Sequence, residues 1–157
     1  MSRRTGVVAA LAISLSAFIV DQGIKRLVEG SMRLGESLPA IPGVLSFTYI
    51  ENDGGAFGVL GGSQFVLLAG SAIAVGVVLW MLFSGEPSRL TSAACGLILG
   101  GAAGNLLDRL TTGEVTDYLD LQFWPLRAWP IFNAADIAIT TGVALLFLSA
   151  LRNPDKG

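Results

Sequence analysis

The fold is decided by the stretch LTSAACGLILGGAAGNLLDR, residues 90–109, which carries no charged side chain until its last two positions. An apolar run of about 20 residues is what a helix needs to cross the hydrocarbon core of a bilayer. Gly96, Gly100 and Gly104 recur at every fourth position, and small residues at this spacing let a neighbouring helix approach closely. The stretch therefore predicts a transmembrane helix packed inside a bundle, with its polar end, residues 105–109, at a membrane boundary.

The composition of the whole chain agrees with a membrane protein. Of its 157 residues 52% are hydrophobic and only 14% are charged, whereas soluble domains carry about 25% charged residues; the mean hydropathy is +0.66. A net charge of −2 without any run of Lys or Arg excludes a nucleic-acid partner. There is no histidine and one cysteine, Cys95, which excludes an internal disulfide and the usual zinc sites.

Four apolar segments are long enough to span a bilayer or nearly so. They are residues 6–24, 65–83, 90–107 and 132–151. We predict an all-α membrane protein, a four-transmembrane-helix bundle that forms one domain over residues 1–157. The first segment, preceded by Arg3 and Arg4, also resembles a cleaved signal peptide, but no clear small-x-small site precedes the polar residues after it.

Positive charge does not orient the chain in the membrane. With the N-terminus in the cytoplasm, five Lys or Arg residues lie on each side, so the positive-inside rule gives a tie. The connection SGEPSR, residues 84–89, must lie on the opposite side from the two long polar segments.

Those two polar segments, residues 25–64 and 108–131, predict extramembrane structure. In the first, Leu45, Phe47 and Tyr49 alternate with polar residues as in a half-buried strand. In the second, YLDLQF alternates in the same way and is followed by tryptophans and prolines, of which tryptophan favours the headgroup level. We expect a small extramembrane β-sheet and an interfacial segment over the outer face of the bundle.

Several acids have simple structural interpretations. Asp21 lies four residues before Lys25, which predicts an ion pair at the end of a helix. Asp136 follows Asn133 at the start of the last apolar segment, which predicts a helix N-terminus capped by the asparagine and favourable to the negative charge. Solvated loop charges are the interpretation for two further acids, Asp120 and Glu114.

The polar residues predicted beside Asp136 indicate a catalytic role as well. Asp117 is predicted on the same membrane face, and two carboxylates within a few ångströms share a proton, which supplies a general base and a general acid at one pH. The ionised aspartate would take a proton from water, while the protonated one would hydrogen-bond a scissile carbonyl and help to protonate the leaving amine. This reaction needs no metal, cofactor or covalent nucleophile. The polar residues predicted beside the pair are Asn52, Asn105, Arg109 and Asn133.

Three other functions were weighed against peptide hydrolysis. A small four-helix transporter could bind protons or cations with the same acids, but its essential carboxylate is expected near the bilayer midplane rather than at the boundary. A membrane scaffold without chemistry would need no paired aspartates. A Mg²⁺ or Ca²⁺ enzyme could use oxygen ligands, yet Asp117 and Asp136 do not form a recognised ligand loop.

Five short motifs follow one another along the chain. They are DQGIK (21–25), ENDGGAFG (51–58), GGAAGNLLDR (100–109), VTDYLD (115–120) and FNAADIAI (132–139). In order and spacing this set resembles the lipoprotein signal peptidases, also called signal peptidase II, and the resemblance covers nearly the whole chain.

The resemblance implies an aspartyl endopeptidase of the bacterial inner membrane, with both termini cytoplasmic and the active site near the outer face. It implies cleavage of prolipoproteins immediately before a cysteine that carries a diacylglyceryl group, contact with membrane lipid, and inhibition by globomycin-type cyclic peptides. We expect a monomer. The catalytic pair of the family falls on Asp117 and Asp136. The other motif residues, implied to shape the site or bind substrate, are Asp21, Lys25, Asn52, Gly54, Asn105, Asp108, Arg109, Asn133 and Ala135.

A few positions depart from the usual pattern of that family. Gly55 stands where alanine is usual, and Thr116 and Tyr118 replace a more typical valine and phenylalanine. None of these removes a carboxylate or an asparagine, so they bear on the stiffness of the substrate loop and on inhibitor affinity. Gly54 is expected to let the segment around it open over the site.

The role of Arg109 is left with two interpretations. It holds the end of the third helix together with Asn105, or it forms a salt bridge with Asp108 or Glu114.

Overall fold

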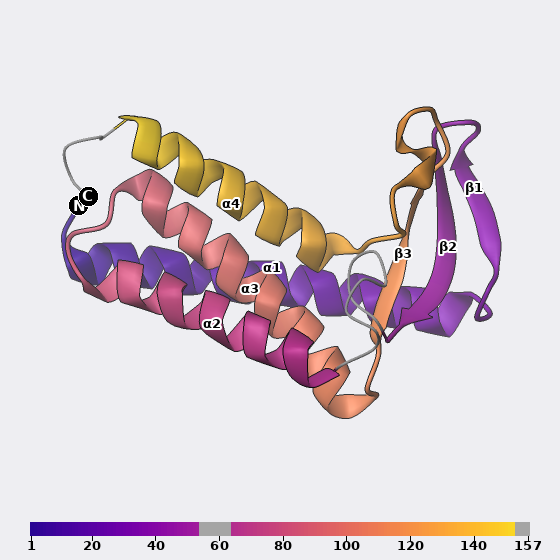
Figure 1. Ribbon diagram of the computed structural model, residues 1–157, viewed down its shortest axis with the longest axis horizontal. Coiled ribbons are helices and arrows are strands. Elements are labelled where there is room, and N and C mark those ends of the chain that lie inside the picture. Colours follow the sequence, from indigo (N-terminus) through magenta and orange to yellow (C-terminus); the bar gives the residue numbers. More distant parts are fainter. Residues whose placement is uncertain (54–63, 153–157) are drawn as a thin grey trace.

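The computed structural model describes the backbone of residues 1–53 and 64–152 and the side chains of residues 1–53 and 71–151. Long helices lie side by side, and a small sheet with a short 3-10 helix lies at one end of them (Figure 1). The elements in chain order are α1 (Arg3–Ser31), β1 (Ser37–Ile41), β2 (Leu45–Asn52), α2 (Gln64–Phe83), α3 (Arg89–Thr111), β3 (Val115–Leu121), η2 (Leu126–Ala128) and α4 (Ala134–Arg152).

Helix α1 differs most from its prediction, because it continues well past residue 24 to Ser31. The predicted pair of Asp21 and Lys25 is confirmed, with 2.9 Å between Oδ2 and Nζ, but both side chains are buried. Asp21 therefore does not mark a helix end as expected, since its partners inside the bundle replace the water that would otherwise solvate it.

Three helices are long and apolar enough to cross a membrane within the part of the chain whose side chains are described. They are α1, α3 and the Ala134–Leu151 part of α4. The described part of α2, Ser71–Phe83, is a shorter apolar helix. A mostly helical membrane protein is thus confirmed, and the count of four spans stays a prediction.

Helix α3 lies between α1 and α4, and its glycines permit both contacts. A Cβ atom on Gly96 would lie 2.6 Å from the carbonyl oxygen of Ala10 in α1. On the other side, a Cβ atom on Gly101 would lie 2.5 Å from the carbonyl oxygen of Ala135 in α4. Since either distance is too short for a methyl group, glycine is required wherever the backbones approach this closely.

The three strands form an antiparallel sheet in the order β1-β2-β3. The two alternating segments predicted a small sheet and correspond to β2 and β3, whereas β1 was not predicted. The predicted common face of Phe47 and Tyr49 is wrong: Phe47 is 38% exposed, whereas Tyr49 is 8% exposed and packs with Val28 of α1 and Tyr118 of β3. A register shift between Phe47 and Ile50 rotates the strand, which places Tyr49 against the helix.

Asp120 also differs from its interpretation as a loop charge. It lies in β3, half-buried, and accepts a hydrogen bond from the Thr48 hydroxyl at 2.9 Å. Glu114 does lie in the connection between α3 and β3, where a hydrogen bond with Glu51 raises its pKa.

Candidate active site

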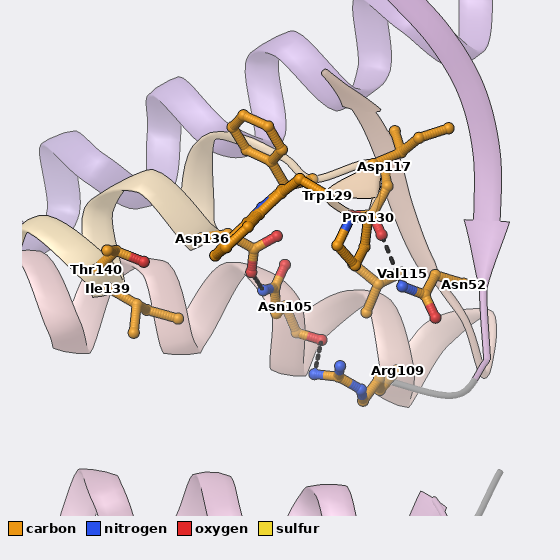
Figure 2. A pocket seen from close by; sticks show the side chains of 12 residues that line it. Asn52, Asn105, Arg109, Val115, Asp117, Trp129, Pro130, Asp136, Ile139 and Thr140 are labelled. Atoms are coloured by element: carbon orange, nitrogen blue, oxygen red, sulfur yellow. Dashed lines mark hydrogen bonds between the residues drawn. The ribbon is translucent and has the colours of Figure 1, made fainter. Parts of the chain in front are cut away.

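Asp117 and Asp136 line one pocket of about 210 Å³, where the sheet meets the ends of α3 and α4 (Figure 2). Asp117 comes from β3 and Asp136 from the first turn of α4. The walls combine polar residues with apolar and aromatic ones. The lining residues are Asn52, Asn105, Arg109, Val115, Asp117, Trp129, Pro130, Ile131, Phe132, Asp136, Ile139 and Thr140.

Pairing of strands β2 and β3 positions Asp117. Ile50 lies opposite Asp117 in the register, so the end of β2 passes beside the aspartate. The side-chain amide of Asn52 then donates to Asp117 Oδ2 at 2.8 Å (Figure 2). Residues 54–63, which include Gly54, lie outside the described residues, so the expected opening of this segment over the site stays a prediction.

Asp136 is held by a reciprocal cap at the start of α4. Its N–H donates to Asn133 Oδ1 at 3.0 Å, and the Asn133 N–H donates to Asp136 Oδ2 at 3.2 Å. This is the capping-box arrangement, which also places a negative charge at the positive end of the helix. The predicted cap is confirmed, and the second oxygen, Oδ1, accepts a hydrogen bond from the Asn105 amide at 2.9 Å (Figure 2).

Asn133 connects the two aspartates. It is fully buried, and its Nδ2 donates to Asp117 Oδ1 at 2.6 Å while its own Oδ1 accepts from the Asp136 N–H. The same Nδ2 lies 3.1 Å from Asn105 Oδ1. Two asparagines therefore give each aspartate an amide donor and fix the position of both carboxyl groups.

Burial raises the pKa of Asp117 to about 7. The negative charge of Asp136 acts in the same direction, while hydrogen bonds from Asn52 and Asn133 and the positive charge of Lys25 oppose it. A carboxyl group with this pKa can hold or release a proton near neutral pH, which general acid and base catalysis both require.

Behind the pocket a buried lysine joins two other aspartates. Lys25 Nζ lies 2.9 Å from Asp21 Oδ2, 2.6 Å from Asp108 Oδ2 and 2.9 Å from Asn105 Oδ1. We call Asp21, Lys25 and Asp108 the ionic cluster. Asp21 Oδ1 also accepts the N–H of Ala135 at 2.9 Å, so the cluster caps the helix that carries Asp136.

The other predicted residues lie close by. Ala135 is completely buried, against Gly101 of α3. Arg109 lines the pocket, and its guanidinium donates to the carbonyl oxygen of Asn105 at 3.5 Å (Figure 2). This contact agrees with its first interpretation, a residue that holds the end of α3.

Sequence reasoning missed two polar contributors. Gln22 donates to Asp108 Oδ1 at 2.8 Å and to the Gly104 carbonyl at 3.3 Å, and its position beside Asp21 was a usable signal. The Tyr118 hydroxyl accepts the N–H of Ala134 at 3.1 Å, a contact that phenylalanine could not make. The apolar residues from Trp129 to Phe132 that line the pocket could not be identified from the sequence, because any segment at a membrane boundary contains such residues.

In the described part of the chain, no group of three or more Asp, Glu, His or Cys residues is arranged to hold a metal ion. The oxygens of Asp117 and Asp136 accept N–H groups instead, as described above. The chemistry that this arrangement supports directly is proton transfer between carboxyl groups and a molecule in the pocket.

Comparison with known proteins identifies relatives over almost the whole chain. The family model for Signal peptidase (SPase) II matches residues 13–152. A lipoprotein signal peptidase of Symbiobacterium thermophilum is 40% identical over 149 residues, which is 94% of this chain and 97% of that protein. A lipoprotein signal peptidase of Lactobacillus gasseri is 39% identical over 155 residues, covering 98% and 99% of the two chains.

Solved structures agree with this relationship. A bacterial membrane enzyme determined by the in meso method at 2.3 Å resolution superposes with a TM-score of 0.85 at 29% identity, over 95% of this chain and 91% of that one. Another, determined at 1.9 Å resolution, gives a TM-score of 0.82, also at 29% identity, over 94% and 95% of the two chains. The chain is therefore a multi-pass membrane peptidase that belongs to the signal peptidase II family.

Proposed function

We propose that Asp117 and Asp136 are the catalytic dyad of an aspartyl endopeptidase that cleaves prolipoproteins immediately before an S-diacylglyceryl cysteine. One observation carries the proposal: two carboxyl groups from different elements line one pocket, and the pKa of one of them is raised to about 7 by burial. Many relatives named lipoprotein signal peptidase support the substrate class.

In the proposed reaction the two carboxyl groups hold one proton between them. The ionised aspartate removes a proton from a water molecule, whose oxygen attacks the scissile carbonyl carbon. The protonated aspartate donates a hydrogen bond to the carbonyl oxygen, and a proton then passes to the leaving nitrogen as the C–N bond breaks. The products are a signal peptide with a new carboxyl group and a lipoprotein with a free amino-terminal cysteine.

The amide donors have a defined part in this scheme. Asn105 and Asn133 hold one oxygen of each aspartate by a hydrogen bond, which restricts rotation of the carboxyl groups. Positioned acid and base groups avoid the entropic cost of bringing them to the substrate during the reaction.

The membrane location suits a lipidated substrate. A diacylglyceryl group keeps its acyl chains in the bilayer, so the bond beside it reaches an enzyme only at the membrane boundary. We propose four membrane spans in the bacterial inner membrane and a site at its outer face. The first residues and the end of α4 lie together at the end opposite the sheet (Figure 1), so both termini would be cytoplasmic.

The pocket is also the proposed binding site of globomycin-type cyclic peptides, which would compete with the substrate. Both aspartates and both asparagines come from one chain, so a monomer is sufficient for the proposed reaction. Binding of such an inhibitor should therefore saturate at one molecule per chain.

The proposal is tested by incubating the purified protein in lipid with one prolipoprotein in two forms, with and without the diacylglyceryl group, and identifying products by mass spectrometry. We expect cleavage only of the modified form, at the bond before the modified cysteine, and the same rate with EDTA present. Equal cleavage of both forms would overturn the substrate class. Inhibition by EDTA that a divalent cation reverses would overturn the metal-free mechanism.

A further inference from the structure

The buried lysine of the ionic cluster touches the proposed active site through one side chain, that of Asn105. The Lys25 ammonium has three partners, of which two are carboxylates and the third is Asn105 Oδ1 at 2.9 Å. An ammonium donates three hydrogen bonds and accepts none. Because only 1% of the lysine is exposed, these protein groups replace water as its partners.

The chemistry of the ammonium fixes the orientation of the Asn105 side-chain amide. The atom of Asn105 that faces Lys25 has to be oxygen, since an NH₂ group there would oppose another donor. The NH₂ group of Asn105 must then face Asp136, where Nδ2 lies 2.9 Å from Oδ1. Asn105 Oδ1 also accepts from Asn133 Nδ2 at 3.1 Å, in agreement with the orientation that the Asp136 N–H gives the Asn133 amide, which donates to Asp117 Oδ1 at 2.6 Å.

We propose that Lys25 is a positioning residue that orients the Asn105 amide, and thereby places an N–H donor on Asp136 of the proposed dyad while its charge acts on Asp117. The proposal rests on the proposed function, since it concerns the same two aspartates. Lys25 does not line the pocket, so it acts through Asn105 rather than on the substrate.

Loss of the cation has a chemical consequence that a loss of packing alone would not have. Without Lys25 the cation that requires oxygen on this side of Asn105 is lost, so the donor on Asp136 is held less firmly, whereas the Asn133 amide stays oriented by the Asp136 N–H. An N–H donor favours the ionised form of a carboxyl group, and so does a nearby positive charge. The charge of Lys25 is also among the effects that lower the pKa of Asp117, against the larger effect of burial.

The other charges around the dyad remain in place when Lys25 is replaced. They are Asp21 of α1 and Asp108 and Arg109 of α3. Two of these are acids and one is a base, so removal of the lysine leaves a more negative surrounding. Both effects raise the pH at which the dyad loses its shared proton.

The test compares Lys25→Met with Arg26→Met, which removes the same charge from the neighbouring position, where the side chain is 70% exposed and paired with Glu29. The rate of cleavage of a lipidated prolipoprotein is measured from pH 4 to pH 9. For Lys25→Met we expect a lower maximal rate and an alkaline limb shifted upward by about one pH unit; for Arg26→Met we expect the wild-type profile. A lower rate with an unshifted alkaline limb would overturn the proposal, because a merely structural role predicts that result.

A second readout does not depend on peptide cleavage. The infrared C=O band of protonated carboxyl groups is titrated in the wild type and in Lys25→Met, each as a difference from its Asp117→Asn derivative. We expect the midpoint in Lys25→Met to lie about one pH unit higher, and equal midpoints would overturn the proposal. If the wild type cleaves no prolipoprotein, the proposed function fails while this titration still decides the role of Lys25.

Unpaired carboxylates could prevent Lys25→Met from folding, so a double variant is included. Lys25→Met with Asp108→Asn removes one charge of each sign and leaves the net charge of the buried group as it was. The same upward shift of the infrared midpoint is expected, with Asp108→Asn alone as its control. A double variant that matches Asp108→Asn would overturn the proposal.

Discussion

Two pairs of aspartates lie side by side in this protein and differ in the groups that contact their carboxyl oxygens. In the ionic cluster, Asp21 and Asp108 share the Lys25 ammonium at 2.9 and 2.6 Å. In the proposed dyad, the oxygens of Asp117 and Asp136 accept N–H groups of Asn52, Asn105 and Asn133. A buried cation stabilises carboxylates in their ionised form, whereas carboxyl groups held by neutral amides can keep a proton near pH 7.

The ionic cluster therefore has a structural role and the proposed dyad a chemical one, although the two groups are neighbours. The ionic cluster holds α1, α3 and the start of α4 together through Asp108 and the Asp21 contact with the Ala135 N–H. The proposed dyad faces the pocket. Asn105 contacts both groups, so the Lys25 ammonium of one region is linked to Asp136 of the other by one side-chain amide.

Removing the cation is expected to have the largest effect on stability. Lys25→Met leaves two buried carboxylates without a counter-charge, as in the dyad, and should lower the free energy of unfolding by about 3–5 kcal/mol. Arg26→Met breaks only an exposed pair and should cost about 0–1 kcal/mol. Thermal unfolding of both variants in the same detergent measures the difference. Equal melting temperatures would mean that the cluster does not hold the bundle together.

The pH dependence of stability should distinguish the dyad from the cluster. Because the pKa of Asp117 is raised from 3.8 to about 7, the folded protein binds a proton more tightly than the unfolded chain. The stabilisation from this proton is complete below about pH 4 and is lost as the pH rises toward 7. It corresponds to a few kcal/mol, at about 1.4 kcal/mol per pKa unit.

Asp117→Asn lacks this titration. Between pH 4 and pH 7 the melting temperature of the wild type should therefore fall relative to that of the variant, by several degrees in total. Parallel curves over this range would show that Asp117 has an ordinary pKa in the folded protein, and the contrast between the two regions would lose its basis.

A smaller steric change tests how tightly the cluster is packed. A Cβ atom at Gly104 would meet Asp21 Oδ2, whereas one at Gly23 would meet nothing within 4 Å. We expect Gly104→Ala to destabilise by about 1–3 kcal/mol, as overpacked substitutions do. Gly23→Ala should stabilise slightly, because alanine favours a helix more than glycine does. Similar melting temperatures for the two variants would contradict the close approach of α3 to Asp21.

The smallest effect is expected from the tyrosine next to the dyad. Burial raises the pKa of Tyr118 to about 12, so its hydroxyl keeps its proton while the oxygen accepts the Ala134 N–H at 3.1 Å. Tyr118→Phe leaves that N–H unpaired at the start of α4 and should cost about 1 kcal/mol. A melting temperature equal to that of the wild type would show that this contact contributes nothing measurable.

The sequence predicted which residues form the site better than it predicted how deeply they are buried. Asp117, Asp136, Asn105 and Asn133 were selected from their motifs, and the structure brings them together. Asp21 was expected at a helix end because a charge inside an apolar helix is costly. Its compensation by Lys25 is local in sequence, but the contributions of Asp108 and Ala135 come from distant segments that only the fold brings near.

The sequence did not predict which face of the sheet each residue of β2 occupies, nor which residues line the pocket, for related reasons. Alternation placed Phe47 and Tyr49 on one face, but a register shift in β2 reverses this, and a single sequence carries no signal for such a shift. Trp129, Ile139 and Thr140 line the pocket, although apolar residues near a membrane boundary are equally compatible with contact to lipid.

The most direct measurement is the cleavage rate of a lipidated prolipoprotein by the wild type, Asp117→Asn, Asp136→Asn and Asp120→Asn. Asp120 is the matched control, because it lies on the same strand as Asp117, is half-buried and does not line the pocket. We predict that both dyad variants, shown to be folded by thermal unfolding, lose activity by about 10³-fold or more, while Asp120→Asn cleaves like the wild type. A folded dyad variant that cleaves as fast as Asp120→Asn would contradict catalysis by the pair.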